Sequence, residues 1–168
     1  MGGFSVVVLM GILSFIYLFF IAIFVAVVLY IIMSYTFQGI SIMCMCKNMG
    51  YKNTFTAWIP FYNKYLLGKI AGNKIMGAIS GILSFIAICL GTRFYINKEL
   101  EIVLFIILVI SLIITFILDT MIAHRIYKSR ANKYGDILTV FNILSLGLLR
   151  PIFLFIIRNK KEQCSIKQ

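Results

Sequence analysis

Two ionisable residues, Asp119 and Arg150, stand within long apolar stretches of the chain. A charge at the centre of a bilayer costs about 2.5 to 3.5 kcal/mol on insertion scales, so such residues are expected to have a partner or a function. A carboxylate and a guanidinium at such positions can serve a proton or ion pathway, or can form ion pairs near the helix ends. The sequence favours the structural role.

The expected partners follow from the distance of each charge to the inner end of its own helix. Asp119 is about 6 Å from that end, whereas Arg150 is roughly 20 Å from it at 1.5 Å per residue. We therefore expect that the two residues do not pair with each other. Arg150 is expected to reach outward toward Glu101, and Asp119 to meet Asn142 and Lys74 near the inner face.

Other reactive side chains form no recognisable catalytic or metal site. Residues 43–46, Met-Cys-Met-Cys, supply soft ligands, but neighbours on a helix diverge by about 100° and no His accompanies them. Ser80 lacks the first glycine of a Gly-x-Ser-x-Gly motif, and the lone His124 adjoins Arg125 at a helix end. The sequence therefore predicts no enzyme, no metal site and no cofactor.

The composition indicates the class of protein. Hydrophobic residues make up 62% of the 168 residues and charged residues 12%, against about 45–50% and about 25% in soluble domains. The apolar runs are continuous instead of alternating with a period of two, which argues against a barrel and favours helices in lipid. We therefore expect an all-α integral membrane protein.

Four apolar stretches predict transmembrane helices at about 8–37, 75–92, 102–123 and 137–157. Together they are expected to form a single polytopic membrane domain over residues 1–160, followed by a short basic tail at 161–168. Small residues at helical spacing predict close helix packing. These are Ala22, Ala26, Gly77, Gly81 and Ser84.

Residues 47–74 interrupt the apolar runs, and their five lysines are accompanied by no Asp or Glu. Within them, residues 53–72 predict an amphipathic helix, broken at Pro60, that lies at the headgroups with its aromatic side chains inward. Its lysines are expected to extend to water. The residues expected to contact lipid or a partner are Lys47, Lys52, Trp58, Tyr62, Lys64, Tyr65, Lys69 and Lys74.

The same stretch carries a family resemblance. The run A-W-I-P-F-Y-N-K-Y-L-L-G-K-I-A-G at 57–72, preceded by K-N-M-G-Y-K-N, resembles a family of small uncharacterised multi-pass bacterial membrane proteins. The run F-L-F-I-I-R-N-K at 153–160 is similar to the ending of that family. The resemblance implies a basic helix end, a Trp-Ile-Pro segment and further spans, and it implies no activity.

The distribution of basic residues predicts the orientation. Placing the first and third loops in the cytoplasm puts nine basic residues inside, against two in the second loop and four after the last span. The N-terminus is then outside, but the basic tail also lies outside, against the rule. A re-entrant fourth segment, interrupted at Arg150-Pro151, would return the tail to the cytoplasm. The 21 residues at 137–157 suffice to span, so a true crossing is favoured.

The net charge of +11 is explained by this orientation, so no nucleic-acid partner is expected. We expect a non-enzymatic interaction or scaffold component of the bacterial cytoplasmic membrane. Its basic aromatic loop would contact anionic lipid, and its protein partner would be a membrane protein or a second copy of the chain in a homo-oligomer. The alternative is a small transporter, channel or holin-like protein that uses Asp119 and Arg150.

Overall fold

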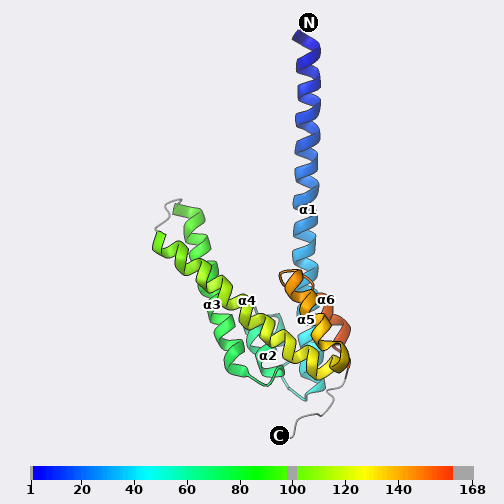
Figure 1. Ribbon diagram of the computed structural model, residues 1–168, viewed down its shortest axis with the longest axis vertical. Helices are drawn as coiled ribbons and strands as arrows, with labels where there is room; N and C mark the ends of the chain where they lie inside the picture. The colour runs from blue at the N-terminus through cyan, green and yellow to red at the C-terminus, as the bar shows by residue number, and fades with distance from the viewer. Residues whose placement is uncertain (1, 98–101, 161–168) are drawn as a thin grey trace. The chain divides into compact units, whose positions relative to one another are not determined.

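The computed structural model describes residues 2–97 and 102–160, and these residues form helices and the turns between them (Figure 1). The chain divides into two compact units, Met1–Thr36 and Phe37–Gln168. Glu101 and the tail expected at 161–168 lie outside the described residues. The elements are α1 (Gly2–Asn48), η1 (Phe55–Trp58), α2 (Tyr62–Ile70), α3 (Lys74–Asn97), α4 (Ile102–Ala131), η2 (Asn132–Tyr134), α5 (Gly135–Leu144) and α6 (Arg150–Ile157).

Three helices, α1, α3 and α4, are long and apolar enough to cross a membrane. Their candidate spans contain 41, 23 and 30 residues. At 1.5 Å per residue these are roughly 60, 35 and 45 Å long, against a hydrocarbon core of about 30 Å. Most side chains in these spans are not covered by other parts of the protein, as expected for helices that lie in lipid. The all-helical, membrane-type architecture predicted from composition is therefore present.

The single crossing helix expected at 137–157 is not formed. This part of the chain is instead two short helices, α5 with 10 residues and α6 with 8. They extend about 15 and 12 Å, too short for either to cross alone. Leu146 and Gly147 take the left-handed conformation, with φ of 52° and 83°, and the Gly147 N–H donates to the Asn142 carbonyl at 2.8 Å. This cap ends α5, and Pro151 begins a new helix.

The helices α5 and α6 form a hairpin beside α4. A Cβ placed on Gly147 would lie 3.8 Å from the ring of Phe116, which is roughly 22 Å along α4 from its end at Ala131. Beyond α6 the chain is back at that end, where Arg130 Nη1 donates to the Lys160 carbonyl at 2.9 Å. In Figure 1, α5 accordingly leads away from the end of α4 and α6 returns.

The helix α2 lies antiparallel along α3, which differs from the interfacial helix expected at 53–72. A Cβ on Gly77 would lie 2.5 Å from the Lys64 carbonyl oxygen and 2.8 Å from Gly68 Cα, and one on Gly81 would lie 3.0 Å from the Phe61 carbonyl oxygen. These glycines allow the two backbones to touch. Pro60 lies in the turn between η1 and α2, and Phe61 follows it with φ of 65°.

The core of the second unit is built from the end of α1 together with α2, α4 and α6. Its fully covered side chains include Ile42 and Met45 of α1, Ile126 and Tyr127 of α4, and Leu154 of α6. The η1 segment joins this core through Trp58, whose ring lies 3.1 Å from where a Cβ on Gly39 would be. The second unit is thus a helical bundle in which α2 packs against α3, and the α5–α6 hairpin packs against α4.

Candidate functional site

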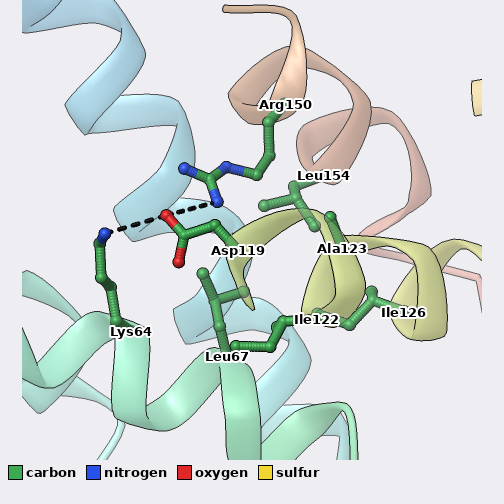
Figure 2. Close-up of a pocket in the computed structure, with 8 residues that line it drawn as sticks. All are labelled: Lys64, Leu67, Asp119, Ile122, Ala123, Ile126, Arg150 and Leu154. Carbon is green, nitrogen blue, oxygen red and sulfur yellow. Dashed lines mark hydrogen bonds and ion pairs between the residues drawn. The ribbon is translucent and has the colours of Figure 1, made fainter. Parts of the chain in front are cut away.

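Asp119 of α4 is the centre of a cluster of charged side chains (Figure 2). Its Oδ2 lies 2.9 Å from Lys64 Nζ of α2 and 2.9 Å from Arg150 Nη1 of α6. Its Oδ1 accepts a hydrogen bond from the Ser80 hydroxyl of α3. Figure 2 shows the two cations approaching the carboxylate from different sides. The cluster therefore joins four helices through one carboxylate.

The expectation that Asp119 and Arg150 do not pair is wrong. The hairpin brings the first residue of α6 level with Asp119, whereas a crossing helix would have carried it away. Arg150 therefore pairs with Asp119. Glu101, the partner expected for Arg150, lies outside the described residues. The partners expected for Asp119 are also wrong, because Lys74 is exposed and Asn142 is buried without a hydrogen bond to its Oδ1 from any described residue.

The cluster holds one negative and two positive charges. Asp119 is 7% exposed, and the side chains of Lys64 and Arg150 are 18% and 19% exposed. Buried charges are tolerated when they are paired and hydrogen-bonded, and removing one member of such a pair typically costs about 3–5 kcal/mol. Asp119 neutralises one of the two cations, so the cluster keeps one net positive charge.

The excess charge is partly compensated by hydroxyl groups of α3. Lys64 Nζ donates to the Ser84 oxygen at 2.6 Å, and the Ser84 hydroxyl donates to the Ser80 carbonyl at 2.7 Å. Ser80 and Ser84 are one turn apart and therefore share a face of α3. Arg150 Nε is buried without a hydrogen-bond partner among the described residues. The Lys64 end of the cluster is thus more completely bonded than the Arg150 end.

The sequence predicts that Lys64 extends to water, and this prediction is wrong. The packing of α2 on α3 directs the Lys64 side chain inward. The Lys64 carbonyl rests on Gly77, and the side chain then reaches Asp119 beside Leu67. Around the charges lie apolar side chains of α2, α4 and α6, and they leave no room for a water molecule. This arrangement fits a structural ion cluster better than a hydrated pathway. Those side chains are Leu67, Ile122, Ala123, Ile126 and Leu154.

A second charged region lies where α1, α4 and α6 end. Asn48 Nδ2 donates to the Arg158 carbonyl at 3.4 Å, and Arg130 Nη1 donates to the Lys160 carbonyl. The Tyr51 N–H donates to the Cys46 carbonyl at 3.0 Å, and the Tyr51 ring lies under Lys69 Nζ. We call this region the basic end. Its basic residues are Lys47, Lys69, Arg125, Lys128, Arg130, Arg158 and Lys160.

The aromatic residues of residues 53–72 do not form one surface. Trp58 packs on Gly39, whereas Tyr62 and Tyr65 pair with ring centroids 5.3 Å apart and line a groove between α2 and α3. Lys69 Nζ lies 4.0 Å above the ring of Tyr51. Of the lysines expected to face lipid, Lys47, Lys52 and Lys74 are exposed.

The small residues expected at helix contacts have different surroundings. Gly77 and Gly81 adjoin α2, and Ser84 accepts a hydrogen bond from Lys64. Ala22 and Ala26 are exposed in the first unit, whose described residues form a single helical segment.

Two members of the cluster were not assigned to it from the sequence. The sequence places Lys64 among the lysines expected to contact lipid, and it favours helix packing over a nucleophilic role for Ser80. The spacing of Gly77, Ser80, Gly81 and Ser84 indicates such a site. On one side of the helix, glycines that allow another helix to approach alternate with serines whose hydroxyl groups can form hydrogen bonds to it. Comparison with known proteins adds nothing to this assignment, because no family model, curated protein or solved structure matches the chain.

Proposed function

We propose that the protein crosses the bacterial cytoplasmic membrane three times, through α1, α3 and α4, with its N-terminus outside and the basic end in the cytoplasm. The α5–α6 hairpin would then enter the membrane from the cytoplasmic side and return to it. The hydrogen bond from Arg130 to the Lys160 carbonyl supports this, because it joins the end of α4 to the chain beyond α6.

This topology agrees with the positive-inside rule. Among the described residues outside the ion cluster, Arg93 is the one basic residue at the outer end of a span. The others lie near the inner ends of α1, α3, α4 and α6. The re-entrant hairpin therefore removes the conflict that four crossings create for the basic residues after α6.

We infer that the protein is a non-enzymatic interaction or scaffold component of the membrane and that its basic end contacts anionic lipid headgroups. The observation that carries this proposal is that no acidic group among the described residues neutralises the basic residues there. The acidic residues in the described part of the chain are Asp119, which is buried in the ion cluster, and Asp136, which lies 3.9 Å from His124. Each basic residue near an anionic surface contributes about 1 kcal/mol.

The experiment is native mass spectrometry of lipids that remain bound after purification in mild detergent. A variant with Lys47, Arg125 and Lys128 changed to Gln should lose most bound phosphatidylglycerol and keep its phosphatidylethanolamine. Single variants supply a matched comparison, because Arg125→Gln and Arg93→Gln remove the same exposed group from opposite ends of the spans. Equal lipid content in these two variants would contradict the proposal.

A second candidate is ion or proton transport through the ion cluster. It is favoured by the position of Asp119, roughly 18 Å along α4 from its inner end. The close apolar packing around the cluster opposes it. Proton and potassium flux into liposomes that contain the purified protein tests this candidate. Flux that disappears in Asp119→Asn, with the variant still folded, would replace the scaffold proposal by transport.

A further inference from the structure

We propose that the groove between α2 and α3 binds one acyl chain of an anionic phospholipid, whose headgroup lies at Lys74. This inference rests on the proposed membrane topology and adds a defined lipid site to it. The groove has a volume of about 440 Å³ and is lined almost wholly by apolar surface. Its walls include Phe61, which precedes α2, Tyr62 and Tyr65 of α2, and Ala78, Ile82 and Phe85 of α3.

The occupant follows first from where the groove lies. The helix α3 is a candidate membrane span, and Ile82 and Phe85 are 61% and 54% exposed on it. An open apolar groove on such a helix faces the acyl chains of the bilayer. At the end of the groove farther from Lys74, the rings of Phe61 and Phe85 meet edge to face, with centroids 5.4 Å apart. The groove is therefore open toward lipid and closed at one end by aromatic rings.

The spacing of residues on α3 places a positive charge at the other end. Lys74, Ala78 and Ile82 are four residues apart and Phe85 follows three later, so all four lie on one stripe of the helix. Lys74 is the first residue of α3 and is exposed. From Lys74 to Phe85 the stripe is roughly 16 Å long, about half of a 30 Å hydrocarbon core. That length suits one acyl chain of one leaflet.

The charge at the mouth selects the headgroup. A lysine close to a lipid phosphate favours an anionic over a neutral headgroup, and no acidic residue is present between residues 47 and 97 to oppose it. Lys69, at the neighbouring end of α2, is held over the ring of Tyr51. Lys74 is therefore the residue expected to determine lipid selectivity at this site.

The test uses a tryptophan reporter in the groove. Trp58 is the single tryptophan of the chain, so Trp58→Phe combined with Tyr62→Trp gives fluorescence from the groove alone. The reporter protein is placed in phosphatidylcholine bilayers that contain acyl-brominated phosphatidylglycerol or acyl-brominated phosphatidylcholine. We expect phosphatidylglycerol to quench at about fivefold lower mole fraction, which corresponds to about 1 kcal/mol for one lysine.

Two pairs of variants separate the headgroup from the acyl chain. Lys74→Gln should abolish the fivefold preference, whereas Lys52→Gln, an exposed lysine away from the groove, should keep it. Ala78→Phe fills the groove and should reduce quenching by both lipids, whereas Ile79→Phe adds a ring on the adjacent, exposed position and should not. Equal quenching by the two lipids, or equal effects within either pair, would overturn the inference.

A measurement without the reporter guards against a disturbed fold. Native mass spectrometry of the unmodified chain and of Lys74→Gln should show one tightly bound phosphatidylglycerol lost in the variant. If quenching instead depends on protein concentration and not on lipid type, a second copy of the chain occupies the groove and the inference is wrong. Should the groove fail while Arg125→Gln still removes anionic lipid, the proposed function of the basic end stands and only the groove site is rejected.

Discussion

Removing the carboxylate of Asp119 should destabilise the protein far more than removing either charge of a surface pair. In Asp119→Asn, both Lys64 and Arg150 lose their ion pair, and Arg150 Nε is already without a hydrogen bond among the described residues. Breaking a buried pair by removing one partner costs about 3–5 kcal/mol, because the other charge is left uncompensated. We expect a loss in this range in the free energy of unfolding.

Removing the positive charge of Lys64 should lower the free energy of unfolding by less than removing the Asp119 carboxylate. Lys64→Met leaves Asp119 paired with Arg150, so that one negative charge then faces one positive charge. The lost contacts are one ion pair, at a side chain that is 18% exposed, and one hydrogen bond to Ser84. We expect a cost of about 1.5–3 kcal/mol, the range for hydrogen bonds to charged groups. The double variant, Lys64→Met with Asp119→Asn, should be more stable than Asp119→Asn alone, because it removes one of the two cations that Asp119→Asn leaves unpaired.

The assay is unfolding by sodium dodecyl sulfate in mixed micelles, followed by circular dichroism, with all variants in one detergent. Asp136→Asn is the matched control, since it makes the same chemical change at a side chain that is 77% exposed, and it should alter the unfolding free energy by less than about 0.5 kcal/mol. The reasoning is refuted if Asp119→Asn is no less stable than Lys64→Met, or if the double variant shows no recovery.

Two further substitutions test how the cluster is positioned. Gly77→Ala should destabilise the protein by about 1–3 kcal/mol, because the new Cβ would lie 2.5 Å from the Lys64 carbonyl oxygen. Gly11→Ala is the control and should not destabilise it, because nothing lies within 4 Å of the new Cβ; equal effects of the two variants in thermal unfolding would contradict the close contact. Ser80→Ala should cost about 1.5–3 kcal/mol by removing a hydrogen bond to the buried Asp119 carboxylate, and an unchanged unfolding free energy would show that this bond is not important.

Much of the fold could be predicted because it depends on composition and on long apolar runs. The three long helices are visible as uncharged stretches, and the glycines at 77 and 81 indicate a face that another helix approaches. Asp119 could be recognised as an unusual residue, since a lone carboxylate in an apolar run needs a partner. None of these conclusions requires knowledge of where distant segments meet.

The partners of Asp119 could not be predicted, because they depend on two local choices of the backbone. Residues 137–157 are predominantly apolar, and a crossing helix and a hairpin bury their apolar side chains equally well in lipid. The hairpin forms through a left-handed turn that includes Leu146. Leucine rarely adopts positive φ, so the residue type does not predict this turn. Lys64 similarly points inward because Gly68 and Gly77 fix how α2 rotates on α3.

The most direct test of the topology asks on which side of the membrane the chain lies after α6. Single cysteines at Lys160→Cys and Arg93→Cys, in a chain with its native cysteines replaced, are treated in intact cells with a maleimide that does not cross membranes. We expect labelling at position 93 in intact cells, and labelling at position 160 only after the cells are opened. Labelling at position 160 in intact cells would show that the α5–α6 segment crosses, and would contradict the hairpin and the cytoplasmic basic end together.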